Sequence, residues 1–165
     1  MKHRSLRLTI VALLCAVLPA CRHVRHLSEI SQITYTSRAG TILPEMQWYE
    51  EIVITPDQVT LHRNGMTSDT EINEGDWVWS PDVEDVRAFF QELEAVDCST
   101  IRRVEREPEE GGGTETYTIV YAGGKKFRFA EGDEDTYTDS WLLWKPIKEY
   151  IAQMDMPQEA RPRSK

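Results

Sequence analysis

The segment Glu50–Arg63, EEIVITPDQVTLHR, decides the fold because its apolar residues allow one hairpin register. The predicted cross-strand pairs are Ile54 with Val59, Ile52 with Leu61, and Glu50 with Arg63. This register leaves residues 55–58 as a four-residue loop, in which Pro56 suits the second position of a type I turn. A slip of one residue would set Ile54 against polar Thr60 and divide the apolar face.

A second hairpin is predicted in residues 116–129, TYTIVYAGGKKFRF. Its apolar face would consist of Tyr117, Ile119, Tyr121, Phe127 and Phe129. These five side chains share one side of the sheet only if the loop has an odd number of residues. We therefore predict a three-residue loop drawn from Ala122–Lys125, with a glycine at positive φ. Lys126 and Arg128 would then point to the opposite, wetter face.

The rest of the chain predicts further strands and two helices. Strands are expected at Ile30–Thr36, Trp77–Trp79 and Ile101–Glu107. The first helix, within residues 80–96, would have Ser80 as its N-cap and Pro81 in its first turn. Its apolar stripe would be Val83, Val86, Phe89, Phe90, Leu93 and Val96. A second helix lies within residues 138–154, where we expect Pro146 to force a fresh start near Lys145. This order predicts an α+β fold: an antiparallel sheet of β-hairpins with two helices packed on one face.

The N-terminus has the three-part form of a secretory signal. A basic front of Lys2, Arg4 and Arg7 precedes the apolar run Leu8–Leu18. A membrane-spanning helix needs roughly 20 apolar residues, and this run has about half that length. It therefore predicts an export leader rather than a transmembrane helix.

The end of this leader, Leu18-Pro19-Ala20-Cys21, resembles the lipobox of bacterial lipoproteins. Leu18 and Ala20 match the pattern, whereas Pro19 replaces the small or aliphatic residue usual there. The resemblance implies cleavage before Cys21, acylation of Cys21 and a lipid anchor in the cell envelope, with the domain facing the periplasm. Arg22 after the cysteine favours the outer membrane over the inner in a cell that has one. Ordinary cleavage without lipidation is the alternative, and Cys21 and Cys98 could then form a disulfide.

About 145 residues remain after the leader, enough for one hydrophobic core and not for two. The predicted divisions are a signal peptide at 1–20, a lipidated N-terminus and tether at 21–28, one globular α+β domain at 29–156, and a disordered tail at 157–165.

The chain is acidic. Its formal net charge is −9, and loss of the leader with its three cations takes this to −12. Such a charge repels nucleic acid, so no nucleic-acid partner is expected. It suits a basic protein partner, although high solubility is the simplest explanation. No motif implies a cofactor.

Two tryptophans are candidates for a binding surface. Trp77 and Trp79 project from the same side of a predicted strand and could form an aromatic platform for a glycan or a partner. Aromatic side chains more commonly supply core area, about 150–250 Å² each, and this is the alternative interpretation. Cys98, beside Asp97, is expected to be a small buried hydrophobic residue rather than a nucleophile.

Asp133, Asp135 and Asp139 are weak candidates for a calcium site. Asp133 and Asp135 have the spacing with which calcium loops begin. The sixth loop position, however, is Thr138 instead of glycine, and the twelfth is Trp144 instead of glutamate. We therefore expect an ordinary acidic turn, with Thr138 or Asp139 capping the next helix, and no bound metal.

The sequence contains no nucleophile elbow, zinc-protease motif or phosphate-binding glycine loop. The leading hypothesis is therefore a non-enzymatic, lipid-anchored protein-binding module. One alternative is a periplasmic immunity or inhibitor protein against a basic toxin or hydrolase. Another is a glycan-binding or glycan-hydrolysing enzyme with a carboxylate site.

The lipid anchor predicts that labelled fatty acid is incorporated into the full chain and that incorporation is lost in Cys21→Ser. Metabolic labelling followed by capture of the protein measures this. Equal labelling of the variant would contradict lipidation at Cys21.

Overall fold

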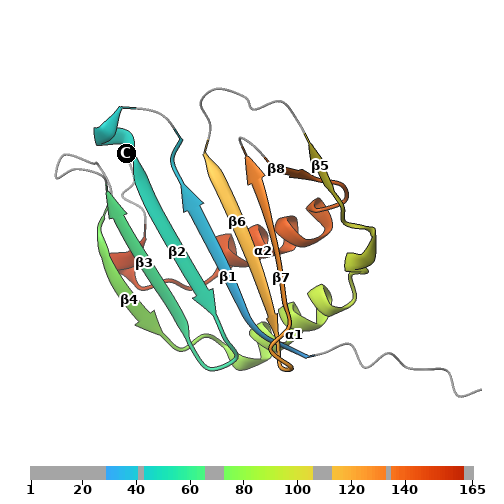
Figure 1. Ribbon diagram of the computed structural model, residues 1–165. Helices are drawn as coiled ribbons and strands as arrows, with labels where there is room; N and C mark the ends of the chain where they lie inside the picture. The colour runs from blue at the N-terminus through green and yellow to red at the C-terminus, as the bar shows by residue number, and fades with distance from the viewer. Residues whose placement is uncertain (1–28, 41–42, 66–72, 106–112, 133–134, 162–165) are drawn as a thin grey trace, which may run out of the picture.

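A computed structural model describes residues 29–40, 43–65, 73–105, 113–132 and 135–161. These residues form eight strands in one antiparallel sheet, with two α-helices on the same side of it (Figure 1). The strands are β1 Ile30–Arg38, β2 Trp48–Ile54, β3 Val59–Gly65, β4 Gly75–Trp79, β5 Arg103–Glu105, β6 Thr114–Tyr121, β7 Lys126–Gly132 and β8 Asp135–Tyr137. The helices are α1 Val83–Glu94 and α2 Trp141–Gln153, with short 3-10 helices η1 Pro44–Met46, η2 Cys98–Thr100 and η3 Gln158–Ala160.

The strand order across the sheet is β4-β3-β2-β1-β6-β7-β8-β5. Strands β1 to β4 follow one another outward to one edge. The chain then passes through α1 to β5 at the opposite edge, and β6 returns to the centre beside β1. After β8, α2 runs back behind the sheet (Figure 1). The predicted α+β fold is therefore confirmed.

Both predicted hairpin registers are confirmed. Between β2 and β3, Ile54 pairs with Val59 and Glu50 with Arg63. The four-residue loop between them is closed by the Thr55 amide, which donates to the Gln58 carbonyl at 2.9 Å.

The β6–β7 hairpin has the predicted three-residue loop. Tyr121 and Lys125 close it, since the Tyr121 amide donates to the Lys125 carbonyl at 2.9 Å. Gly124 has φ +77°, a conformation that favours glycine. Tyr117 therefore pairs with Phe129, and both are buried.

The two faces of the sheet differ because side chains alternate along each strand. The face toward the helices carries the buried residues Ile33, Tyr35, Ile52, Ile54, Val59, Leu61, Tyr117, Ile119 and Phe129. The opposite face carries half-buried threonines of the central strands, namely Thr34, Thr36, Thr60, Thr116 and Thr118. The core thus lies between one face of the sheet and the two helices.

Helix α1 begins later than the sequence suggested. Its N-cap is Asp82, whose carboxylate accepts from the backbone amides of Glu84 and Asp85. Ser80 is therefore not the cap, because the carboxylate satisfies two amides and its charge complements the helix dipole. Val86, Phe89, Phe90 and Leu93 form the buried stripe as predicted, but Val83 is 47% exposed.

Helix α2 continues through Pro146, so the expected fresh start near Lys145 is wrong. Proline removes one backbone hydrogen bond from the helix. Leu143 and Ile147, one turn apart on either side of it, are both fully buried against the core. Their packing holds the helix together despite the missing bond.

The start of α2 is also not capped as predicted. Its N-cap residue is Ser140, which is buried and whose hydroxyl donates to the Glu131 carboxylate and accepts no cap bond. Thr138 instead bonds to the segment before β5, where its hydroxyl accepts from the Arg102 amide at 3.1 Å. Asp139 is exposed, with φ 55°.

The predicted disordered tail from Pro157 is wrong for residues 157–161. Helix η3 packs on the domain, and Ala160 is fully buried in the core cluster. Asn73 holds the neighbouring backbone, since its amide nitrogen donates to the carbonyls of Glu159 (2.7 Å) and Arg161 (2.8 Å). The sequence PQEARPRSK suggested disorder because it offers few apolar residues. The contacts that order its start come from Arg63 and Asn73, which are distant in the sequence.

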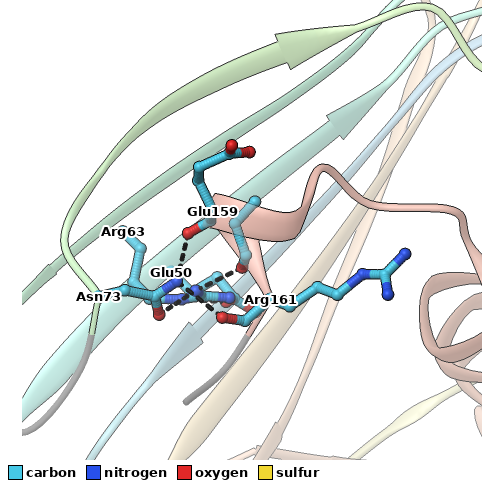
Figure 2. Close-up of polar contacts among 6 residues, drawn as sticks. Glu50, Arg63, Asn73, Glu159 and Arg161 are labelled. Atoms are coloured by element: carbon cyan, nitrogen blue, oxygen red, sulfur yellow. Dashed lines mark hydrogen bonds and ion pairs between the residues drawn. The ribbon is translucent and has the colours of Figure 1, made fainter.

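Arg63 is the centre of this attachment (Figure 2). Its side chain is only 6% exposed, and its Nε and Nη2 both donate to one carboxylate oxygen of Glu50. Its Nη1 donates to the Asn73 side chain (2.8 Å) and to the Ala160 carbonyl (2.9 Å). The buried charge is thus paired and hydrogen-bonded on every nitrogen.

None of the described helices combines the length and apolar character needed to cross a membrane. The predicted leader and Cys21 lie outside the described residues.

Arg63→Met should lower the free energy of unfolding by about 3–5 kcal/mol, because it leaves the Glu50 carboxylate, whose side chain is only 14% exposed, without its cation. Urea denaturation measures this. The matched control is Arg161→Gln, which breaks the exposed pair with Asp155 and should cost much less. An equal loss of unfolding free energy in the two variants would contradict the structural role given to the Arg63–Glu50 pair.

Candidate binding groove

A cavity of about 630 Å³ lies between α1, α2 and the end of β4, and we call it the α1–α2 groove. Its size is within the range of ligand-binding pockets, about 300–1,000 Å³. The residues that line it are Trp79, Ser80, Pro81, Asp82, Asp85, Ala88, Phe89, Glu92, Pro146, Glu149, Tyr150, Gln153, Met154 and Asp155. Two segments about 60 residues apart in the sequence thus form one concave surface.

Aromatic rings form the apolar part of the groove. The rings of Phe89 on α1 and Tyr150 on α2 lie 4.1 Å apart between centroids, with an interplanar angle of 1°. Phe89 belongs to the buried stripe of α1, and Tyr150 follows buried Ile147 by three residues on α2. Trp79, at the end of β4, completes this part of the lining.

The indole of Trp79 has an unused hydrogen-bonding group. Its Nε1 is buried and has no hydrogen-bond partner among the described residues. Leaving such a donor unpaired costs roughly 1–3 kcal/mol, so it is uncommon in folded proteins. Trp79 therefore packs against the core, lines the groove and carries a buried hydrogen-bond donor that has no partner among the described residues.

The groove is negatively charged. Of the described residues that line it, none is lysine or arginine, and five carry carboxylates: Asp82, Asp85, Glu92, Glu149 and Asp155. Asp85 and Glu92 form no ion pair within the part of the chain that the structure describes. Their charges are therefore uncompensated.

The other carboxylates are partly engaged. Asp82 caps α1. Asp155 pairs with Arg161 at 2.9 Å, and Glu149 lies 3.9 Å from Lys145 on the same helix. Both cations stand outside the lining, which leaves its interior acidic.

The titration of Tyr150 reflects this field. Its pKa is raised from 10.0, first by burial and then by the negative charges of Asp85 and Asp82. The same negative charges would attract a positively charged group that entered the groove and would stabilise it there.

The carboxylates are spread along the groove instead of converging on one point. Within the described ranges, no three His, Cys, Asp or Glu side chains lie close enough together to hold a metal ion. An elongated cationic group that covers several carboxylates fits this arrangement better than a single ion.

A second cluster of titratable groups links α2 to the sheet. The Glu115 carboxylate accepts from the hydroxyls of Tyr35 (3.2 Å) and Tyr117 (2.6 Å), and from Lys148 Nζ at 2.9 and 3.0 Å. Burial by itself would raise the pKa of Glu115, but the bonds from Lys148 and Tyr117 outweigh it and lower the pKa below 4.5. A general acid needs a raised pKa, so this cluster is structural in character.

The tryptophans chosen from the sequence lie on the helix side of β4, and both pack against the core. Trp77 lies beside Arg63, whose guanidinium carbon is 5.8 Å from the ring centroid. The two indoles therefore supply core area instead of an exposed platform, and Trp79 also lines the groove.

The acidic segment does not form a calcium-type loop in the described residues. Asp135 begins strand β8, which pairs with β5, while Asp133 lies outside the described residues. Cys98 packs against the core but is half-buried, so it is less buried than expected. Burial raises the pKa of its thiol.

The sequence carries a partial signal for the groove, on the α1 side alone. Asp82, Asp85, Phe89 and Glu92 are separated by three, four and three residues, so they share one face of α1. This periodicity indicates an acidic edge beside the apolar stripe. It does not indicate that α2 lies opposite, which depends on the tertiary fold.

Comparison with known proteins adds no functional assignment. No protein-family model matches the chain, and a search of curated proteins found no similar sequence.

Glu115→Gln should flatten the acid side of the stability curve. Because folding lowers the Glu115 pKa, its carboxylate stabilises the fold fully above about pH 4.5, and this contribution is lost as the pH falls through the folded-state value. Below about pH 4.5 the free energy of unfolding should therefore fall more steeply in the wild type than in the variant. Urea denaturation at several pH values tests this, with the exposed Glu45→Gln as control; parallel curves for wild type and Glu115→Gln would contradict it.

Proposed function

We propose that this protein is a lipid-anchored cell-envelope protein that binds a basic protein partner through the α1–α2 groove. The observation that carries the proposal is the groove itself, a cavity of about 630 Å³ lined by five carboxylates and by no cation among the described residues. The lipobox-like Leu18-Pro19-Ala20-Cys21 supports the anchor and the periplasmic location. The outer membrane is the proposed site in a cell that has one.

Charge supports a basic partner over other classes. The mature chain would carry −12, which speeds encounter with a positively charged protein and repels nucleic acid. The aromatic part of the groove adds apolar contact area, and aromatic residues are enriched at protein interfaces. An inhibitor or immunity protein against a basic toxin or hydrolase is the narrower form of this proposal, and the identity of the partner decides it.

A glycan ligand is less well supported. Stacking on a sugar needs an exposed aromatic face, whereas Phe89 is 5% exposed and its ring is stacked on Tyr150. Trp77 is likewise packed against the core and Arg63. These contacts favour a protein partner that reaches the carboxylates lining the groove.

Site-specific photocrosslinking in the native cell tests the proposal. A photoreactive amino acid replaces Gln153, an exposed residue of the groove, in the full-length chain. The control position is Arg128, exposed on the opposite face of the sheet. We expect a discrete adduct with a basic protein from position 153 and none from position 128.

Absence of an adduct from position 153, or an adduct from position 128 alone, would contradict the proposed groove. Lipidation is measured separately by the Cys21→Ser labelling experiment, so the anchor and the binding site can fail independently.

A further inference from the structure

The chain binds two of its own guanidinium groups in a consistent way. At the rim of the α1–α2 groove, Arg161 donates from Nη2 to Asp155 (2.9 Å) and from Nε to the Met156 carbonyl (3.1 Å). Inside the domain, Arg63 donates to the Glu50 carboxylate and to a backbone carbonyl (Figure 2). Its guanidinium also lies over the Trp77 ring. A carboxylate and a carbonyl thus hold each arginine, and an indole joins them in the buried case.

The groove offers the same groups without the arginine. Trp79 follows Trp77 by two residues and therefore faces the same side of β4. Its indole N–H is buried and has no partner among the described residues. The carboxylates of Asp85 and Glu92 also line the groove and form no ion pair within the described ranges. An indole and two carboxylates without an ion pair thus line one cavity.

The spacing of these carboxylates indicates the form of the ligand. Asp85 and Glu92 are seven residues apart on α1, which places them about 10 Å apart along the helix axis. In a polyproline II segment, which has three residues per turn and a rise of about 3.1 Å per residue, residues three positions apart lie on the same side and are about 9 Å apart. Two cationic side chains in the pattern cation-x-x-cation would therefore match the two carboxylates.

We propose, resting on the proposed function, that the α1–α2 groove binds a segment of the partner protein in the polyproline II conformation that presents two arginines three residues apart. One guanidinium lies at Asp85 and the other at Glu92, with their side-chain stems against the groove between them.

Arginine fits better than lysine for physical reasons. Its planar guanidinium donates to a carboxylate and a carbonyl at the same time, as Arg161 does. An ammonium group is a compact and strongly hydrated charge without this planar arrangement of donors.

Peptide binding to the full-length protein in detergent micelles tests the inference. The probe is a labelled Gly/Ser peptide that contains Arg-x-x-Arg, and the comparison peptides contain Lys-x-x-Lys or two adjacent arginines. Fluorescence anisotropy at near-physiological salt gives the affinities. We expect the Arg-x-x-Arg peptide to bind at least about fivefold more tightly than either comparison peptide.

The double variant Asp85→Asn/Glu92→Gln should weaken binding of the Arg-x-x-Arg peptide by about tenfold or more. The control Glu45→Gln/Glu84→Gln removes the same charge from exposed positions outside the groove, one of them on the same helix, and should leave the affinity nearly unchanged. Ala88→Arg is a second groove variant at an exposed position, and its introduced cation should also block binding. Circular dichroism verifies that each variant is folded.

Equal affinity for the arginine and lysine peptides, or equal effects of the groove and control variants, would overturn the inference. So would a failure of the Arg-x-x-Arg peptide to bind at millimolar concentration. If the photocrosslinked adduct at position 153 persists in those cases, the proposed protein-binding function stands and the arginine inference alone is wrong.

Discussion

The buried guanidinium of Arg63 is the interaction on which one end of the domain depends. It joins β3 to β2 through Glu50 and holds the C-terminal segment through the Ala160 carbonyl. Because that segment follows α2 directly, Arg63 also fixes where the chain leaves α2, and Asp155 lies in the connection. A charge removed from water is tolerated in a fold only when it is paired and hydrogen-bonded, and loss of its partner is strongly destabilising. The pairing of Arg63 therefore determines the position of one wall of the groove relative to the sheet.

The other determinant of the groove is the packing of α2 against the sheet. Leu143 and Ile147 are fully buried and keep the helix continuous through Pro146. Pro146 itself lines the groove. Phe89 and Tyr150 then bring the two helices together through stacked rings. The acidic edge of α1 faces α2 only because these apolar contacts set the helix positions. Burial thus positions the charges, although the charges themselves stay accessible.

Local sequence patterns predicted the hairpins well because their constraints are local. A loop of fixed length and an alternating apolar face leave one register, as Ile54 with Val59 and Tyr117 with Phe129 show. The errors at Pro146 and in the C-terminal segment have a common physical origin in distant contacts. The residues around Pro146 do not show that packing against the core keeps α2 continuous. The residues around Ala160 do not show that Arg63 binds the Ala160 carbonyl. The groove was missed for the same reason, since its two walls come from separate parts of the chain and only the α1 half has a visible periodicity.

The edges of the sheet affect how readily copies of the protein associate at high local concentration. An antiparallel sheet exposes unpaired backbone groups along its outer strands, which can pair with a neighbouring molecule. Here the outer strands are short: β4 has five residues and β5 has three. Exposed charges, Asp76 on β4 and Arg103 on β5, occupy them. Such edges disfavour strand exchange between copies, so a protein concentrated in two dimensions by an anchor would resist self-association through its sheet.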